Sequence, residues 1–129
     1  MSKYSKVLEW DVVAREILEH AKRLTTLNKP HIFLADQIIY VCTHRSMQVR
    51  QEAAKHINLT DYFLNYMLYD RTRNVRYLAV EQIKRRRMRT RIPAYIIDDL
   101  VEAGLLTSNG RLRPNFAVKK PANFENASN

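Results

Sequence analysis

The sequence predicts an all-α fold of about six helices, with a small C-terminal β-hairpin and an extended tail. The 129 residues include only 2 Gly and 4 Pro, which leaves few positions for the tight turns of a β fold. Apolar side chains recur every three or four residues along most of the chain, as they do in amphipathic helices. A chain of this length builds one hydrophobic core, so we expect a single domain over residues 1–118 and a flexible tail over residues 119–129.

The predicted helices follow one another with short loops between them. Their apolar spacing and flanking residues place them at residues 5–27, 32–43, 47–57, 61–70, 73–89 and 93–103. Residues whose hydroxyl can cap a helix N-terminus precede three of them, at Ser46, Thr60 and Thr72. Proline suits the first turn of the last helix at Pro93, and glycine suits the position just past its end at Gly104.

The residues after Gly104 change pattern. Two short stretches of alternating apolar residues flank Asn109-Gly110, a dipeptide typical of tight hairpin turns, so we expect a small β-hairpin here. The rest of the chain is rich in Asn and Pro and has little apolar periodicity. We expect it to be extended or frayed, and to pack onto the domain through Phe116 and Val118.

A helix followed by a hairpin also ends a winged-helix domain, with Arg111 and Arg113 on the wing. The exposed side of the preceding helix carries Asp98, Asp99 and Glu102. A recognition helix that faces phosphates should not be acidic, so we expect a helical capping unit in preference to a wing.

The net charge of +9 is concentrated in the middle of the chain. Residues 43–91 carry twelve Lys and Arg against four Asp and Glu, a net charge of +8. The segments before and after this one are close to neutral. A local excess of this kind indicates an anionic partner more than a general need for solubility.

Two segments of the chain repeat each other at an offset of 26 residues. Each begins with a short apolar helix, continues through a tight loop, and enters a second helix at a Val-Arg pair. The pairs are Val49-Arg50 and Val75-Arg76. A third copy of the short helix follows at a wider spacing of 33 residues. Because one pair of short helices cannot bury its apolar face alone, we expect the copies to stack.

The stretch over residues 49–80 resembles HEAT-like repeats, and most closely the variant leucine-rich repeat subgroup. The matching features are the two Val-Arg pairs and Asp70 before the second of them, whereas His44 stands where the first Asp belongs. The resemblance covers about residues 32–104 and implies stacked helical hairpins in a small right-handed α-solenoid. Such folds mainly bind macromolecules, and the related HEAT-like DNA glycosylases hold DNA on a basic concave face. The Cys-rich segment of some relatives is absent, so no iron–sulfur cluster is implied.

The two arginines of the Val-Arg pairs have two interpretations. Arg50 and Arg76 could bind a polyanion, but in repeats of this type such an arginine usually pairs with the loop Asp or binds loop carbonyls. Asp70 lies six residues before Arg76, across one tight loop, which suits that structural role.

The main candidate binding surface is the basic run over residues 84–91 together with one cation upstream. Its members are Arg73, Lys84, Arg85, Arg86, Arg87, Arg89 and Arg91. Crowded cations repel one another, and an anion would neutralise them. Arginine, which binds phosphate or carboxylate through two parallel hydrogen bonds, outnumbers lysine. We expect these cations to contact phosphates. There are two alternatives: the cations form a solvated helix end that complements the helix dipole, or they form a patch that binds an acidic protein. On a continuous helix, one face would carry Arg73, Arg76, Lys84, Arg87 and Arg91, while Arg85 and Arg89 would point elsewhere.

A second candidate surface consists of three tyrosines on one arc of the helix over residues 61–70. Tyr62, Tyr66 and Tyr69 lie opposite the apolar side of that helix. Tyrosine is enriched at protein interfaces and also stacks on nucleobases. Packing against the adjacent repeat is the alternative.

The sequence contains no arrangement of residues that indicates catalysis or metal binding. It has no glycine-rich phosphate loop, and its four His residues are not spaced with Cys or acids as metal ligands are. Cys42, the single cysteine, lies on an apolar face as an inert packing residue. We therefore expect no enzyme activity, no metal, no cofactor and no small-molecule substrate. One cysteine and no apolar run near 18 residues predict a cytoplasmic protein without a membrane partner.

Fold and charge together predict a non-enzymatic binding protein that contacts the nucleic-acid backbone with little sequence specificity, through the Arg-rich surface of residues 71–91. The alternative is an adaptor or regulator that docks on an acidic protein, such as RNA polymerase or another transcription or replication component, in the manner of phage-type regulators. Weaker alternatives are a winged-helix DNA-binding protein and a repair enzyme like the HEAT-like glycosylases, for which no catalytic carboxylate stands out.

Overall fold

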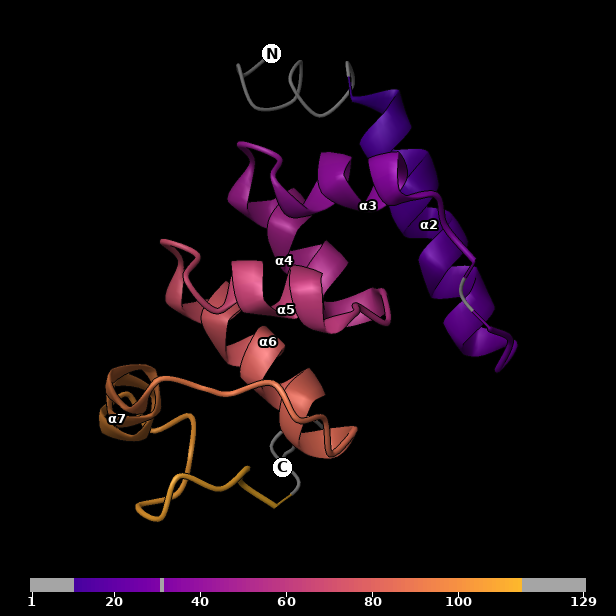
Figure 1. Ribbon diagram of the computed structural model, residues 1–129. Coiled ribbons are helices and arrows are strands. Elements are labelled where there is room, and N and C mark those ends of the chain that lie inside the picture. The colour runs from indigo at the N-terminus through magenta and orange to yellow at the C-terminus, as the bar shows by residue number, and fades with distance from the viewer. Residues whose placement is uncertain (1–10, 31, 115–129) are drawn as a thin grey trace, which may run out of the picture. The chain divides into compact units, whose positions relative to one another are not determined.

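The computed structural model describes residues 11–30 and 32–114, which have an all-helical fold (Figure 1). These residues form six helices, as the sequence predicts. The helices are α2 (Val12–Thr26), α3 (Ala35–Cys42), α4 (Met47–His56), α5 (Asp61–Met67), α6 (Arg73–Arg85) and α7 (Ala94–Glu102). Within these ranges, every helix is too short or too polar to span a lipid bilayer. The predicted tail, the domain boundary at residue 118, and the predicted packing of Phe116 and Val118 lie outside the described residues.

The residues predicted to cap helices occupy the expected positions, but they do not all cap through the side chain. The Ser46 hydroxyl accepts a hydrogen bond from the Val49 N–H at 3.4 Å, at the start of α4. Thr60 and Thr72 precede α5 and α6, but their hydroxyl groups make no capping hydrogen bond to the helix backbone. The Thr72 hydroxyl instead accepts a hydrogen bond from the Arg50 guanidinium at 3.2 Å. This cap residue thus contributes to a contact between two repeats.

Three helices end in the same hydrogen-bonded turn, in which one residue adopts a left-handed backbone conformation. That residue is Asn28 after α2, Arg87 after α6 and Gly104 after α7, with φ of 57°, 52° and 79°. In α6 the Met88 N–H donates to the Ile83 carbonyl at 2.9 Å, which closes the turn and satisfies a carbonyl that the helix leaves free. Glycine and asparagine tolerate this conformation, and arginine does so at a cost.

The end of α6 corrects the prediction of a longer helix through residue 89. α6 stops at Arg85 because the left-handed turn at Arg87 breaks the helical rotation. Arg87 and Arg91 therefore do not continue the helical face on which Arg73 lies. The predicted alignment of these cations along one face is wrong.

Smaller differences affect three other helix boundaries. α3 begins at Ala35, later than residue 32, because the Gln37 side chain accepts a hydrogen bond from the Leu34 N–H at 2.9 Å and fixes the start there. α5 ends at Met67, before residue 70, in a tighter turn. Pro93 lies just before the first residue of α7, whereas the prediction placed it within the first turn of this helix.

The chain divides into two compact units, Met1–Arg91 and Ile92–Asn129. In the first unit α3 contacts α4, and α5 contacts α6, so that two consecutive pairs of helices are formed. These pairs lie one above the other, with α3 against α5 and α4 against α6, and α2 packs on α3 and α4 (Figure 1). The two copies of the 26-residue repeat therefore occupy equivalent places in adjacent pairs.

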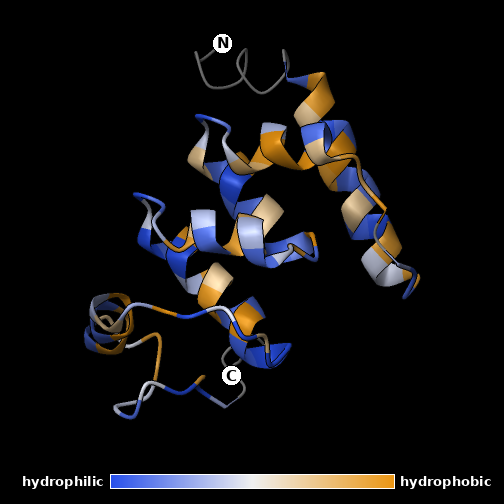
Figure 2. Cartoon of the chain, in the orientation of Figure 1, coloured by the Kyte–Doolittle hydropathy of each residue, from blue (hydrophilic) through white to orange (hydrophobic). Residues whose placement is uncertain are grey.

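The core of the first unit follows the repeat. Val41 and Cys42 at the end of α3 are fully buried, and so are Met67 and Leu68, 26 residues later. The other fully buried side chains include Ala53, Leu59, Leu64, Val75, Ala79 and Val80. Hydrophobic and hydrophilic residues alternate along each helix, and the C-terminal end of α6 is hydrophilic (Figure 2). Burial of equivalent apolar positions is what holds one pair of helices against the next.

In the second unit α7 buries the apolar side that the sequence predicts. Ile96 and Leu100 are buried, and Leu106 is buried in the segment that follows the helix. Asp98 and Glu102, predicted to face outward, are exposed, and Asp99 is half-buried. The predicted amphipathic pattern of this helix is therefore confirmed.

The predicted β-hairpin is not formed as two strands. In the described residues after α7 the chain makes an isolated antiparallel bridge between Leu106 and Leu112. The tight turn is present, because the Gly110 N–H donates to the Thr107 carbonyl at 2.8 Å. The turn takes up most of the segment between Gly104 and Pro114. Pro114 has no N–H to donate to a strand partner, so too few residues remain to form two strands.

Candidate functional site

A buried polar cluster in the first unit joins α4 to the loop between α5 and α6. Arg50 Nε lies 2.8 Å from Asp70 Oδ2, and each side chain is 5% exposed. The guanidinium also donates to the carbonyls of His44 at 2.7 Å and Arg45 at 3.1 Å, and to the Thr72 hydroxyl at 3.2 Å. The charge of Arg50 is therefore compensated within the chain, and the residue has the structural role predicted as one of its two interpretations.

Arg76 repeats part of this arrangement. Arg76 Nη1 donates to the Asp70 carbonyl at 2.8 Å, six residues back, just as Arg50 Nη1 donates to the His44 carbonyl six residues back. The carboxylate of Asp70 pairs with Arg50, one repeat earlier, while its carbonyl accepts from Arg76. Both Val-Arg arginines thus bind carbonyls of their own loops.

His44 takes the place of the missing Asp in the first repeat. His44 Nδ1 accepts from the Ser46 N–H at 3.0 Å, and Asp70 Oδ1 accepts from the Thr72 N–H at 2.9 Å at the equivalent positions. With Nδ1 as the acceptor, a neutral imidazole carries its proton on Nε2, which donates to Asp11 Oδ2. The partner of His44 is therefore an anion, whereas the partner of Asp70 is a cation.

Asp11 ties the start of α2 to the first repeat. Its Oδ1 accepts from the Tyr40 hydroxyl and from the Ala14 N–H, each at 2.9 Å. Burial raises the pKa of Asp11, but these bonds and the one from His44 outweigh burial and lower the pKa below its ordinary value of 3.8. The bond to Asp11 also raises the pKa of Tyr40. Asp11 is thus held as a carboxylate between two elements.

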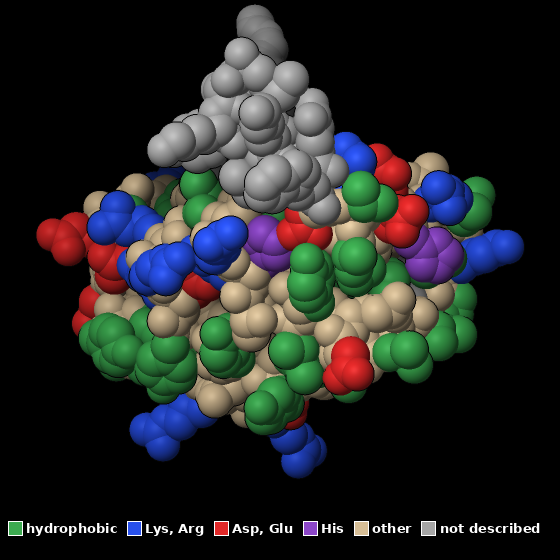
Figure 3. Space-filling view, turned by 90° about the horizontal axis from the view of Figure 1, so that it is seen from above, with side chains coloured by type: hydrophobic (Ala, Val, Ile, Leu, Met, Phe, Trp, Pro, Cys, Tyr) green, Lys and Arg blue, Asp and Glu red, His purple; other side chains and the backbone are tan. Residues whose placement is uncertain are grey.

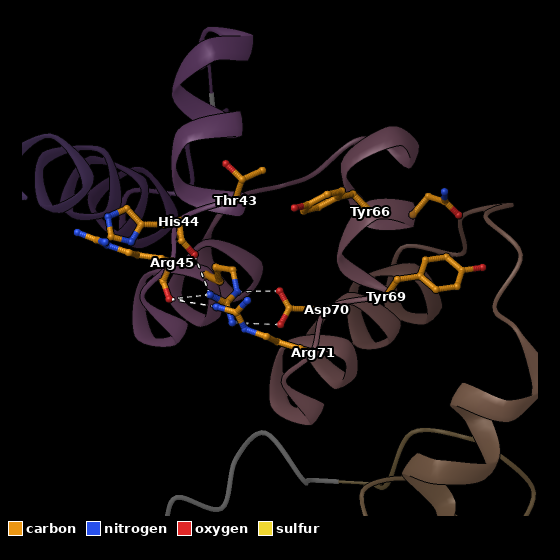
Figure 4. Close-up of a pocket in the computed structure, with 9 residues that line it drawn as sticks. Thr43, His44, Arg45, Tyr66, Tyr69, Asp70 and Arg71 are labelled. Atoms are coloured by element: carbon orange, nitrogen blue, oxygen red, sulfur yellow. Dashed lines mark hydrogen bonds and ion pairs between the residues drawn. The ribbon is translucent and has the colours of Figure 1, made fainter.

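A groove of about 560 Å³ opens beside the buried ion pair (Figure 4). It lies between the loop that follows α3 and the loop that follows α5. We call it the Tyr66 groove, and its exposed lining includes Arg45, Tyr66, Tyr69 and Arg71, together with Thr43 and Asn65. Figure 4 shows the Tyr66 side chain directed toward the loop that holds Thr43, and the Tyr69 side chain directed away from it. The groove therefore combines two cations with an aromatic wall.

The three tyrosines of the predicted surface are exposed. The exposed fractions are 75% for Tyr62, 51% for Tyr66 and 57% for Tyr69. Burial against the adjacent repeat, the alternative interpretation, therefore does not apply to these rings. Tyr66 and Tyr69 line the groove, whereas Tyr62 does not and instead meets the Phe63 ring edge-on at 5.2 Å between centroids.

Arg45 and Arg71 are candidate binding residues that the sequence prediction did not single out. They lie 26 residues apart, at equivalent positions of the two repeats, and both are exposed. Arg71 Nη2 donates to the Arg45 carbonyl at 3.5 Å, and no acid among the described residues lies within ion-pair distance of either side chain. Seen from above, Lys and Arg side chains form a group beside a His side chain (Figure 3). The repeat alignment could have found this pair.

Two members of the predicted basic run are used by the fold. Arg85 Nη2 lies 3.2 Å from Glu81 Oε2, one helical turn back. Arg86 Nη1 donates to the carbonyl of buried Leu59 at 2.7 Å and to Gln82 Oε1 at 2.7 Å. Arg86 therefore fixes the loop between α4 and α5, and it is less available to a ligand than the sequence predicts.

Four other members of the run have no such contact. No acid among the described residues lies within ion-pair distance of Lys84, Arg87, Arg89 or Arg91. Arg87, Arg89 and Arg91 are exposed, and Lys84 is half-buried. They follow one another along the end of α6 and the segment after it, so these cations lie close together in the sequence.

The remaining predicted residues lie elsewhere. Arg73 begins α6 and is therefore about 18 Å from Arg85 along the helix axis, at a rise of about 1.5 Å per residue. Arg111 and Arg113 are exposed in the second unit, next to the isolated bridge, and no two-stranded wing carries them. The predicted set is thus divided into separate groups.

The described His, Cys, Asp and Glu side chains are spread over the fold. Among residues 11–30 and 32–114, no cluster of three or more His, Cys, Asp or Glu could hold a metal ion. Cys42 is fully buried, and burial raises the pKa of its thiol to about 12. A thiol so protonated and inaccessible is unreactive.

Comparison with known proteins adds no relative to these observations. No family model matches the chain, and no curated protein sequence and no solved structure matches it either. Its function is therefore inferred from the contacts, burial and charge described above.

Proposed function

We propose that this chain is a non-enzymatic helical-repeat protein of the HEAT-like type that binds the phosphate backbone of nucleic acid. The repeat interpretation is supported by the equivalent bonds that Arg50 and Arg76 make to the carbonyls six residues before them. It is also supported by the stacking of α3 on α5 and of α4 on α6. Repeats of this kind offer the loops and helix ends at their edges to a partner while their helices stay packed.

The observation that carries the binding proposal is the backbone of Arg87. Asn28 and Gly104, at the equivalent positions after α2 and α7, are residues that adopt a left-handed conformation readily. Arg87 adopts it with φ of 52° at a cost of about 1 kcal/mol relative to glycine. Arg87 keeps this unfavourable backbone conformation and makes no ion pair with the described residues. A role in binding is the simplest explanation for an arginine at this position.

The charge around Arg87 suits phosphate. Arg87, Arg89 and Arg91 are exposed within five residues of chain, and Lys84 lies one turn before them. Guanidinium groups bind phosphate oxygens through paired hydrogen bonds, and a cluster of them draws a polyanion by charge. Phosphate contacts do not read the bases, so binding through this cluster has little sequence specificity.

The experiment is a binding titration of a fluorescent DNA duplex at low salt. The test variant replaces Arg87, Arg89 and Arg91 with Ala. The control variant removes the same charge elsewhere by replacing three exposed cations of the N-terminal part, Arg15, Arg23 and Lys29. We expect the test variant to bind at least tenfold more weakly than the control, since each lost phosphate contact removes a share of the electrostatic affinity.

Equal binding by the two variants would reject this proposal. A protein that copurifies in stoichiometric amount after nuclease treatment, and that the test variant fails to retain, would show that the cluster serves an acidic protein partner such as RNA polymerase. Circular dichroism of both variants must first show unchanged helix content.

A further inference from the structure

We infer that the Tyr66 groove binds an unpaired nucleotide of single-stranded nucleic acid, with its base against Tyr66 and its phosphate at Arg45 and Arg71. This inference rests on the proposed function, because it names the form of nucleic acid that the chain prefers. It concerns a different part of the first unit, since the groove opens near the start of α6 and the Arg87 cluster follows its end.

The charge of the groove favours an anionic ligand. The floor of the groove is the Arg50–Asp70 pair, whose opposite charges compensate each other at 2.8 Å with both side chains 5% exposed. The uncompensated charge beside the groove is therefore that of Arg45 and Arg71, which line it from equivalent loops of the two repeats. Two arginines at the rim of a preformed hollow suit a phosphate group.

The first repeat shows what a tyrosine at the position of Tyr66 does. Tyr40 lies 26 residues earlier and donates its hydroxyl proton to Asp11 Oδ1, an anionic oxygen, at 2.9 Å. The Tyr66 hydroxyl makes no hydrogen bond with the described residues. Its side chain points across the groove toward the loop of Thr43 (Figure 4). A ligand oxygen in the groove would give Tyr66 the kind of acceptor that Asp11 gives Tyr40.

The ring of Tyr66 distinguishes a nucleotide from a simple anion. Half of this side chain is exposed, and it forms a wall of a hollow of about 560 Å³, a volume typical of small-ligand sites. Bases stack on exposed aromatic rings with little regard for sequence. The bases of a duplex already stack on one another, so only an unpaired base can cover Tyr66.

The test uses the full chain and three labelled probes of equal length: oligo(dT), an abasic strand with the same phosphates, and a DNA duplex. The key variant is Tyr66→Leu, and the matched control is Tyr62→Leu, which removes an exposed tyrosine of the same helix outside the groove. Arg45→Gln with Arg71→Gln tests the phosphate contacts. Polyglutamate serves as a competitor that carries charge without bases or phosphates.

We expect the wild type and Tyr62→Leu to bind oligo(dT) more tightly than the abasic strand, by roughly 5- to 150-fold for one stacked base. Tyr66→Leu should bind the two strands alike, with duplex affinity unchanged. The double arginine variant should weaken binding of both single strands. Each result would support the groove as a site for an unpaired nucleotide.

Two results would overturn the inference while leaving the proposed function intact. One is an unchanged preference for oligo(dT) in Tyr66→Leu, when duplex binding still depends on Arg87, Arg89 and Arg91. The other is competition by polyglutamate as strong as that by the abasic strand, which would assign the groove to an acidic protein segment. If none of the three probes binds at low salt, the proposed function and the groove inference both fail.

Discussion

Arg50 and Asp70, twenty residues apart, form a buried ion pair in which Arg50 Nε lies 2.8 Å from Asp70 Oδ2. The pair connects α4 of one repeat with the loop of the next. The guanidinium also donates to two carbonyls of the loop between α3 and α4 and to the Thr72 hydroxyl in the loop between α5 and α6, so one side chain orders both loops. These loops form the edge of the first unit at which the Tyr66 groove opens.

The first prediction concerns this pair. Arg50→Met leaves Asp70 buried without its partner, so the free energy of unfolding should fall by about 3–5 kcal/mol in urea denaturation. The double variant Arg50→Met with Asp70→Leu should lose less than Arg50→Met alone, because no unpaired charge remains. Lys22→Met, which breaks the partly exposed Lys22–Glu52 pair at 2.6 Å, should cost about 0–1 kcal/mol. Equal losses in Arg50→Met and Lys22→Met would contradict the structural role of Arg50.

The second prediction concerns acid. The pKa of Asp11 is lower in the folded protein than its ordinary value of 3.8, so the unfolded chain binds the proton more tightly. The stabilisation from this carboxylate is therefore complete above about pH 4 and is lost as the pH falls through the folded pKa. Asp11→Asn, which can still cap α2, should be less stable than the wild type by about 1 kcal/mol or more at neutral pH. The difference should vanish in acid. A difference that stays constant down to pH 2 would show that the charge of Asp11 plays no part.

The third prediction separates two neighbouring arginines. Arg86→Ala removes hydrogen bonds to the Leu59 carbonyl and to Gln82, so stability should fall by about 1–3 kcal/mol. Arg87→Gly relieves the left-handed backbone, so stability should rise by about 1 kcal/mol. The same Arg87→Gly variant should bind nucleic acid more weakly. Thermal unfolding followed by circular dichroism measures the two changes in stability. We expect the midpoint of unfolding to fall in Arg86→Ala and to rise in Arg87→Gly.

The fourth prediction concerns two glycines of the second unit. Gly104 and Gly110 have φ of 79° and 75°, so Ala at either position strains the backbone. A Cβ at Gly110 would also lie 2.9 Å from Ile97 Cγ2, whereas at Gly104 the nearest atom, Arg113 Nη2, is 4.0 Å away. Gly104→Ala should therefore cost about 1 kcal/mol, and Gly110→Ala should cost about 1–3 kcal/mol more. The extra cost should shrink in an Ile97→Ala background. Equal costs in urea denaturation would show that the contact with Ile97 is unimportant.

Local patterns were sufficient to predict the helices and the repeat. Ser46 caps α4 because its hydroxyl can accept a hydrogen bond from a free N–H in the first turn of the helix. Gly104 follows α7 because the left-handed turn at the end of that helix favours glycine. The equivalence of Val41 with Met67 and of Cys42 with Leu68 follows from apolar spacing alone. These features depend on residues close together in the chain, so the sequence contains the information directly.

The end of α6 and the composition of the candidate site could not be predicted in the same way. Arginine does not signal a left-handed turn, so nothing in the sequence marks Arg87 as the residue whose backbone ends α6. The engagement of Arg86 depends on the Leu59 carbonyl, 27 residues away, and Arg50 depends on Asp70. Long-range contacts of this kind decide which cations are used by the fold and which remain exposed.

The most direct test of phosphate binding at the Arg87 cluster is the salt dependence of DNA duplex binding, measured from about 50 to about 200 mM salt. For the wild type we expect the logarithm of the affinity to fall steeply and linearly with the logarithm of the salt concentration. Replacement of Arg87, Arg89 and Arg91 with Ala should make the slope shallower by about one for each lost contact. The same slope in the wild type and in this variant, or no measurable binding at low salt, would contradict the proposal.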